Sequence, residues 1–275
     1  VPFHMWTPDI YEGAPLPVTA YLAVGSKAAA FALILRLFAS AFLENIGEWQ
    51  LVIAILAAAT MMVGNLVALA QRNIKRLMAY SSIAHVGFIL AGIAALSQDS
   101  PLASNGVMLY LVGYSVTNLV VFAALIAYFN MTGREMISEF AGMADQQPFL
   151  AAAIAIGMFS LGGLPIFAGF TIKFYLFTAV ANEGFLWLAG LAIFNSLLSL
   201  YYYLQVIRQM YIHPPMGAPE TVPEGVSPGA LARAPSVLML AVLAIGLAAV
   251  LWIGVYPSPL LEPIEAASRA ILPGT

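Results

Sequence analysis

Two lysines stand inside long apolar stretches, where charged side chains are rare. Lys27 lies near the centre of the stretch 18–41, and Lys173 lies within 148–182. An ammonium group in the middle of a bilayer is costly unless it faces a partner or a cavity. Because an amine in such surroundings can exist with or without its proton, we interpret both lysines as proton-carrying groups. The alternative for Lys27 is a buried lysine that carbonyl oxygens hold for structural reasons, and the alternative for Lys173 is a hydrated lysine at the mouth of a helix break.

The neighbours of each lysine support this interpretation. Lys27 lies about 15 Å from either membrane surface, which is farther than its stem can reach. Its small neighbours Gly25 and Ser26 allow water or other helices to come close. Lys173 closely follows a predicted helix break, so its charge opposes the positive end of the helix that begins there.

The break is predicted because the stretch 148–182 is too long for one straight span. Glycine and proline weaken or interrupt a helix, and four such residues cluster in its middle: Gly162, Gly163, Pro165 and Gly169. Broken helices mark the substrate path in many transporters. A re-entrant kink without a function is the alternative.

A third candidate for proton chemistry is His85, in the middle of the stretch 77–97. Ser81 and Ser82 precede it by four and three residues and therefore share its helix face. We interpret His85 as a proton relay; a core histidine with satisfied hydrogen bonds is the alternative. Three more polar residues follow at four-residue spacing in the next apolar stretch: Tyr110, Tyr114 and Asn118. Together these groups predict a partly hydrated polar axis at mid-membrane depth.

The composition sets the class of protein that must position these groups. Of the 275 residues 62% are hydrophobic and 8% are charged, whereas soluble domains carry about 25% charged residues. This excludes a soluble enzyme, a disordered chain and a nucleic-acid-binding protein. The sequence has no cysteine, no spacing typical of metal ligands and no nucleotide-binding motif. We therefore expect a polytopic membrane protein that binds no metal, nucleotide or redox cofactor itself.

The fold expected is an all-α transmembrane bundle of about seven spans, one of them discontinuous. The predicted spans are 18–41, 50–70, 77–97, 104–130, 148–182, 185–209 and 235–256. Basic residues in alternate loops set the orientation of such a bundle. Six lie on one side, against Arg269 on the other: Arg72, Lys75, Arg76, Arg134, Arg208 and Arg233. This bias places the loops 71–76, 131–147 and 210–234 in the cytoplasm. Arg36, near the end of its helix, can reach the membrane surface.

We expect one membrane domain over 1–275. Its parts are a broken helix or loop over 1–17, a core of spans over 18–209, a Pro-rich cytoplasmic linker over 210–234, the last span over 235–256 and an outer tail over 257–275. In the first part, Asp9 and Glu12 are expected to pair with a basic group. Because the chain opens at Val1, we expect it to be the C-terminal part of a longer one.

Three segments carry a resemblance to a known family: PFHMWTPDIYEGAP at 2–15, NLVALAQRNIKRLMAYSSIAHVGF at 65–88 and SLGGLPIFAGFTIKFYLF at 160–177. They resemble the subunit N family of bacterial NADH–quinone oxidoreductase (complex I), a family of proton-antiporter-like membrane subunits. The resemblance runs from residue 1 to about 211 and is weaker over 235–275.

The resemblance implies the second half of a fourteen-helix bundle that contains two inverted repeats. It implies that Lys27 is the connecting lysine, His85 the histidine of the tenth helix and Lys173 the terminal lysine of the broken twelfth helix. The chain would then hold the exit half of one proton channel in a bacterial plasma (inner) membrane. The NADH and quinone sites and the other membrane-arm subunits would be its partners in the assembly. A subunit of a multisubunit Na⁺/H⁺ (Mrp-type) antiporter or of a membrane-bound hydrogenase is the alternative, and a structural scaffold is a third class.

Overall fold

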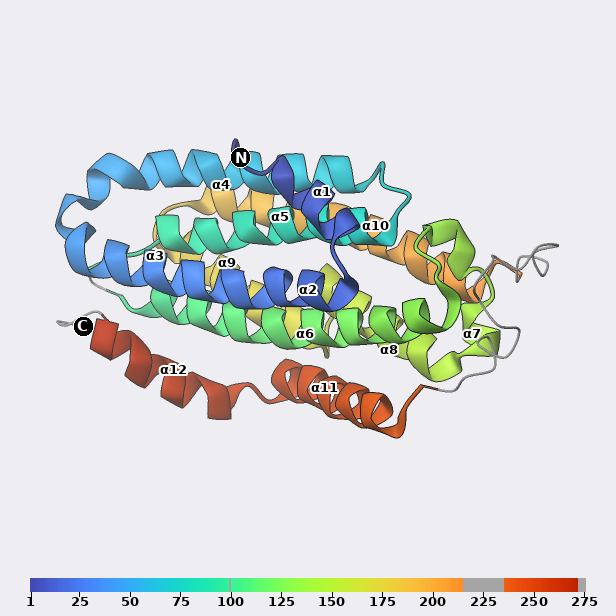
Figure 1. The fold of residues 1–275 in the computed structure, drawn as a ribbon. Coiled ribbons are helices and arrows are strands. Elements are labelled where there is room, and N and C mark those ends of the chain that lie inside the picture. Colours follow the sequence, from blue (N-terminus) through green and yellow to red (C-terminus); the bar gives the residue numbers. More distant parts are fainter. Residues whose placement is uncertain (99, 215–234, 272–275) are drawn as a thin grey trace.

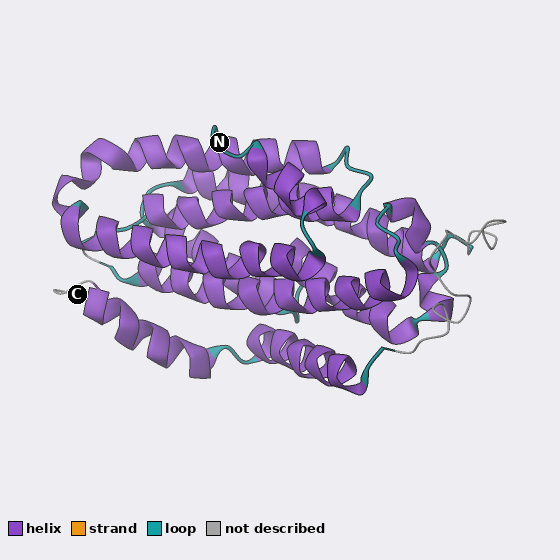
Figure 2. Ribbon diagram, in the orientation of Figure 1, coloured by secondary structure: helices purple, strands orange, loops and turns teal. Residues whose placement is uncertain are grey.

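The structure, a computed structural model, describes residues 1–98, 100–214 and 235–271. Apart from one isolated bridge between Asn73 and Met136, all regular structure in this part of the chain is helical (Figure 2). The helices form an elongated bundle in which most of them run along the long axis (Figure 1). The predicted all-α bundle is therefore confirmed. Most of the predicted linker 210–234, with Arg233, and the last residues of the predicted tail lie outside the described residues.

Within the described residues, six helical segments are long and apolar enough to cross a membrane. The first is composite: it joins α2 (Leu16–Tyr21), a π-helical turn (Leu22–Ser26) and α3 (Lys27–Ala41). The other five are α4 (Ile46–Ala68), α5 (Ile74–Ala94), α6 (Leu102–Thr132), α10 (Leu186–Tyr211) and α11 (Val237–Val255). Each overlaps one of the predicted spans. Helices are required here because a bilayer offers no hydrogen-bond partners to an open backbone.

The remaining predicted span, 148–182, consists of two shorter helices, α8 (Pro148–Gly162) and α9 (Ala168–Asn182). The residue after α8, Gly163, has a φ of 87°, a left-handed conformation that glycine adopts without strain. Ile166 also has a positive φ, of 80°, which is unusual for a β-branched residue and marks local strain in the connection. Gly162 thus closes α8, Pro165 lies in the connection, and Gly169 lies in the first turn of α9.

Helix α5 is the centre of the bundle and is buried on nearly all its faces. It packs most closely on α4, where a methyl group at Gly64 or Gly87 would lie 2.5 Å from a backbone nitrogen of the other helix. Small residues allow such close approach between membrane helices. Large apolar side chains point away from the bundle instead, as at Leu51 and Ile55, which are 58% and 55% exposed. An apolar exterior around a polar-containing core is typical of a protein that lipid surrounds.

The two ends of the bundle differ in charge. At one end lie the loop 69–73, the segment 133–147 with the short helices η3 (Ile137–Phe140) and α7 (Met143–Gln146), and the end of α10. This basic end carries Arg72, Arg76, Arg134 and Arg208. The acidic end carries Glu44 after α3, Glu48 in the first turn of α4 and Glu183 directly after α9.

The regions outside the spans are also helical. The predicted broken segment 1–17 contains α1 (Trp6–Gly13), which Ala14 and Pro15 separate from α2. The predicted tail contains the amphipathic helix α12 (Ser258–Ile271), which runs along the bundle toward the acidic end and contacts α6 (Figure 1).

Candidate functional site

Lys27 is the first residue after the π-helical turn Leu22–Ser26. Its Nζ donates to the hydroxyl of Tyr114 at 3.3 Å and to the carbonyl oxygen of Ser82 at 3.4 Å. The ammonium also lies 5.4 Å from the centre of the Tyr114 ring. The side chain is half-buried, and its charge is stabilised by an oxygen pair and an aromatic face rather than by a carboxylate.

A cavity of about 470 Å³ opens beside Lys27. It is lined by residues of the N-terminal segment, of the first membrane segment and of α4 and α5, among them Tyr11, Ser26 and Thr60. The polar atoms of these side chains give water places to bind next to the amine. The amine of Lys27 therefore borders a cavity that contains several polar side chains.

His85 lies deep in the bundle and is 2% exposed. Its Nδ1 forms a 2.6 Å hydrogen bond with the hydroxyl of Tyr110. Its ring centre is 4.9 Å from that of Tyr114, the residue that accepts from Lys27. Its Nε2 is buried and has no hydrogen-bond partner among the described residues. A neutral imidazole that binds through one nitrogen keeps the other available to take up or give a proton.

Lys173 is 4% exposed, and its side chain extends from α9 to the end of α8. Its Nζ donates to the carbonyl oxygen of Leu161 at 2.7 Å and to Oγ of Ser196 at 2.9 Å. Ser196 in turn donates to the carbonyl oxygen of Gly162 at 3.2 Å. The lysine thus occupies the negative, carbonyl-bearing end of α8, where a cation is favourable.

This position differs from the expectation that the charge of Lys173 opposes the helix that begins at the break. Lys173 is one turn beyond the start of α9, where the field of the helix end has weakened. Its flexible stem carries the amine back past Gly163, whose missing side chain leaves room for it. The break therefore supplies carbonyl oxygens to the ammonium group.

A second cavity, of about 610 Å³, adjoins Lys173. Its walls are mostly apolar and come from α9 and α10, for example Phe174, Phe177 and Leu197, with Ser196 as a polar exception. The ring of Phe88 contacts both this lysine and His85: Nζ of Lys173 is 5.3 Å from its ring centre, and the His85 ring centre is 5.6 Å from the same ring.

The structure brings most of the predicted polar axis together. Lys27, Ser82, Tyr114, His85 and Tyr110 form one connected group, in which Oγ of Ser82 lies 3.1 Å from the hydroxyl of Tyr114. Asn118 sits at its edge and donates to the Tyr114 carbonyl oxygen at 3.0 Å. Ser81 points elsewhere and bonds the hydroxyl of Tyr203 on α10. Lys173 hydrogen-bonds Leu161 and Ser196 instead, and it meets the group through the ring of Phe88, which contacts both Lys173 and His85.

Three tyrosines that make contacts here were not among the predicted site residues: Tyr11, Tyr202 and Tyr203. On α10, Tyr203 bonds Ser81, and the neighbouring Tyr202 donates to Oδ1 of Asn65 at 3.0 Å. Asn65 donates to Asn195 at 3.0 Å and so joins α4 to α10. Tyr11, from α1, lies 3.3 Å from Oγ of Ser82. A tyrosine that lies far away in the sequence gives no periodic signal, so these contacts could be identified only from the structure.

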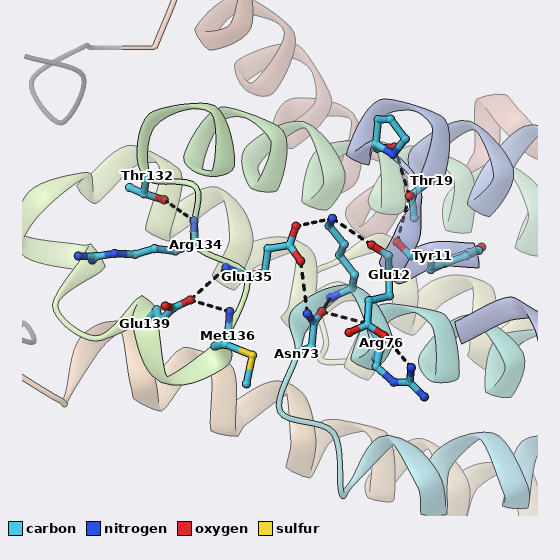
Figure 3. A network of polar contacts seen from close by, with 12 residues as sticks. Tyr11, Glu12, Thr19, Asn73, Arg76, Thr132, Arg134, Glu135, Met136 and Glu139 are labelled. Atoms are coloured by element: carbon cyan, nitrogen blue, oxygen red, sulfur yellow. Dashed lines mark hydrogen bonds and ion pairs between the residues drawn. The ribbon is translucent and has the colours of Figure 1, made fainter. Parts of the chain in front are cut away.

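The basic group that pairs with Asp9 and Glu12 is Arg76, at the start of α5. Its Nη1 lies 3.1 Å from Oδ1 of Asp9 and 2.6 Å from Oε2 of Glu12. Beside it, Lys75 pairs with Glu135 and donates to the backbone oxygen of Glu12 at 3.3 Å (Figure 3). We call these five residues the basic-end ion cluster.

Lys75 was predicted only as one of the loop residues that set the orientation. In the structure it is 6% exposed and pairs with Glu135, whose side chain is a quarter exposed. Its amine also lies 5.2 Å from the ring centre of Phe129. The loop 133–147 folds back on the start of α5 through the bridge of Asn73 with Met136, and this fold covers the lysine.

The Lys75→Ala variant is expected to lower the free energy of unfolding by about 3 kcal/mol, because it leaves Glu135 partly buried without its partner. Thermal unfolding of the detergent-solubilised protein would measure the change. The variant Arg72→Ala, which removes an exposed charge from the loop directly before α5, is the matched control. Replacing Lys75 with Met and Glu135 with Leu together should restore most of the lost stability. A single variant as stable as the parent would show that the pair contributes nothing.

The buried polar groups of this site are of types that can bind and release protons. Among the described residues, no group of three or more histidine, aspartate or glutamate side chains could hold a metal ion. Two amines, an imidazole and several hydroxyls lie inside an apolar bundle, each lysine beside its own cavity. A broken helix adjoins Lys173. Fold and site together define an antiporter-like membrane subunit.

The chain belongs to the family described as NADH:quinone oxidoreductase/Mrp antiporter, TM, whose profile matches residues 1–199. It is 44% identical over 262 residues to NADH-quinone oxidoreductase subunit N of Moorella thermoacetica, covering 94% of this chain and 52% of the relative. It is also 44% identical over 274 residues to subunit N of Parvibaculum lavamentivorans, covering 99% and 54%. The chain therefore spans about half the length of the curated relatives it matches.

Solved structures agree with this membership. A chain of respiratory complex I from Thermus thermophilus with bound aureothin has 31% identity and a TM-score of 0.75, over 95% of this chain and 54% of that one. A chain of the Mrp complex from Dietzia has 23% identity and a TM-score of 0.88, over 99% and 56%, and shows the shared fold. The chain is thus a homologue of the proton-antiporter-like subunit N of complex I.

Proposed function

We propose that the chain forms the second half of a proton-translocating subunit of a bacterial NADH–quinone oxidoreductase. Protons would pass along Lys27, His85 and Lys173 while quinone is reduced in other subunits. The observation that carries the proposal is the placement of both lysines, each inside the bundle beside its own cavity, with His85 between them. The bacterial relatives at 40–45% identity support the choice of complex.

Proton transfer would begin at Lys27, which exchanges with its cavity. Its ammonium donates to Tyr114, and Tyr114 touches both Ser82 and the ring of His85. Hydroxyls and imidazoles can accept one proton while giving up another, so this group can relay a charge without moving far. The free Nε2 of His85 provides the next acceptor.

The second step would be transfer from His85 toward Lys173 past the ring of Phe88. A positive charge on His85 repels charges on both lysines, and such repulsion is strong where water does not screen it. Protonation of one group would therefore favour release from the next. In this scheme the chain supplies proton movement alone, and the redox centres lie in partner subunits.

The orientation follows from the basic end. Because positively charged loops remain in the cytoplasm, the basic end would face the cytoplasm of a bacterium and the acidic end the outside of the plasma membrane. Other membrane-arm subunits and lipid would cover the exposed apolar faces. In the Mrp-type alternative the same groups would exchange Na⁺ for protons.

The Lys27→Ala variant tests the proposal in the full-length subunit within its membrane complex. Proton transfer coupled to quinone reduction is expected to fall about a hundredfold, because an acid–base group is lost. Arg36→Ala, which removes an exposed basic residue from the same helix, should leave it unchanged. Fluorescence quenching in inverted membrane vesicles measures the transfer. Unchanged proton transfer in Lys27→Ala would overturn the proposal, and Na⁺-dependent exchange without quinone reduction would favour the Mrp-type alternative.

A further inference from the structure

We propose that Tyr11 is a further member of the proton path and that the basic-end ion cluster holds it in place. This inference rests on the proposed function, because it extends the path that starts at Lys27. It assigns a role to α1, which lies outside the membrane spans, and to a set of ion pairs that the path itself does not use.

The hydroxyl of Tyr11 completes a row of three hydroxyls that ends at Lys27. It lies 3.3 Å from Oγ of Ser82, which lies 3.1 Å from the hydroxyl of Tyr114. Tyr114 accepts from Nζ of Lys27 at 3.3 Å, so its own proton can point to Ser82. The proton of Ser82 can then point to Tyr11. All the hydroxyls can be oriented in one direction, as proton relay requires.

Tyr11 also borders the space from which Lys27 would exchange protons. Both residues line the cavity of about 470 Å³. The tyrosine is 2% exposed, so its ring is packed while its hydroxyl reaches the hydrogen-bonded group. The chain thus has a second contact between this cavity and Ser82, separate from the amine of Lys27.

Helix α1 has too little of its own structure to fix Tyr11. It has 8 residues, and Ala14 and Pro15 separate it from α2. Helices this short are not stable by themselves in water. Its position must therefore come from contacts with other elements, chiefly α5.

Besides the buried residues of α1, the ion cluster provides polar contacts with α5 on either side of Tyr11. Asp9 precedes the tyrosine by two residues and Glu12 follows it directly, and both carboxylates bind the guanidinium of Arg76. Lys75 adds a bond to the backbone oxygen of Glu12 (Figure 3). A guanidinium is suited to this task because its planar donors hold two carboxylates in fixed directions.

Arg76 and Ser82 lie on the same helix, six residues apart. The ion pairs therefore attach α1 to α5 at one level, and the contact of Tyr11 with Ser82 lies about two turns deeper. The ion pairs, by fixing α1 against α5, therefore also fix the position of Tyr11 relative to Ser82. Arg76 is in this view a positioning residue that acts through Tyr11.

The Tyr11→Phe variant in the full-length subunit within its complex tests the first part. It removes only the hydroxyl, and proton transfer coupled to quinone reduction should fall about fivefold, as expected for one lost hydrogen bond. Assembly is checked from the amount of intact complex on a native gel. If the variant does not assemble, Ser82→Ala removes the other half of the same contact and should give a similar loss. Unchanged transfer in the assembled variant would overturn the inference.

A double-mutant cycle tests the second part. Arg76→Ala should lower proton transfer severalfold in the parent but add little in the Tyr11→Phe background, and Arg76→Lys should restore part of it. A purely structural role for Arg76 would give additive losses and overturn the positioning role. Arg72→Ala, which removes an exposed charge from the loop directly before α5, should change nothing.

The Lys27→Ala variant separates this inference from the proposed function. Loss of proton transfer in Lys27→Ala together with normal proton transfer in Tyr11→Phe would overturn only the role of Tyr11. Normal transfer in Lys27→Ala would overturn the proposed function, whatever Tyr11→Phe does.

Discussion

Replacing Lys173 with methionine is expected to slow proton transfer across the membrane about a hundredfold, because the path loses an acid–base group. Methionine has nearly the length of lysine but cannot carry a proton. Lys173 is 4% exposed, and its amine donates to Leu161 and Ser196. Proton transfer and quinone reduction would be measured together in inverted vesicles, and both should fall if the two are coupled.

The Lys173→Arg variant separates the proton-carrying role from a structural one. Arginine keeps a positive charge and several donors for the carbonyl end of α8, but it does not release its proton at physiological pH. The adjoining cavity of about 610 Å³ leaves room for the larger group. We expect normal assembly and stability with lost proton transfer. Normal proton transfer in this variant would show that Lys173 only caps α8.

The spans could be predicted because apolar length is a strong signal in a membrane protein. Each long helix overlaps a predicted stretch, and the connection between α8 and α9 falls among the predicted glycines and proline. The rarity of charge also singled out Lys27 and Lys173. Their roles, and that of His85, stay predictions until variants are measured.

The direction in which a side chain extends could not be predicted in the same way. Lys173 follows the break in sequence, yet its amine binds the end of the helix before it. A lysine stem is long enough to reach either side, so only the packing of α8 against α9 decides. Lys75 gives a similar lesson: its burial depends on the loop around Glu135 folding over α5.

The π-helical turn Leu22–Ser26 also could not be predicted from the sequence. Nothing in its composition differs from an ordinary helix, apart from Gly25 and the hydroxyl of Ser26, which bonds the carbonyl oxygen of Leu22 at 2.6 Å. π-Helical turns occur often at functional sites. This one ends directly before Lys27 and rotates the amine relative to α2, a local change that no periodicity reveals.

The close contact of α8 with α9 leads to the second large effect that we expect. Gly169 lies in the first turn of α9, and a methyl group there would overlap the carbonyl oxygen of Ser160 on α8. The backbone nitrogen of Gly169 also donates to Oγ of Ser160 at 3.0 Å. Gly169→Ala must therefore push the two half-helices apart, at a cost of about 1–3 kcal/mol for overpacking.

This displacement should stop proton transfer even though every titratable group is present. Lys173 lies one turn after Gly169, and its acceptor Leu161 directly follows Ser160, so the 2.7 Å bond spans the gap that opens. A shift of about 1 Å can slow a reaction about a hundredfold. Proton transfer in vesicles that contain Gly169→Ala would measure this.

Gly47→Ala is the matched control, because Gly47 is also the second residue of its helix but has no atom within 4 Å of an added methyl group. It should assemble and transfer protons normally. If Gly169→Ala assembled and transferred protons as fast as Gly47→Ala, the contact of Lys173 with the end of α8 would be unnecessary for transfer. Loss in Gly169→Ala alone would mean that the path depends on the position of Lys173 at the break as well as on its charge.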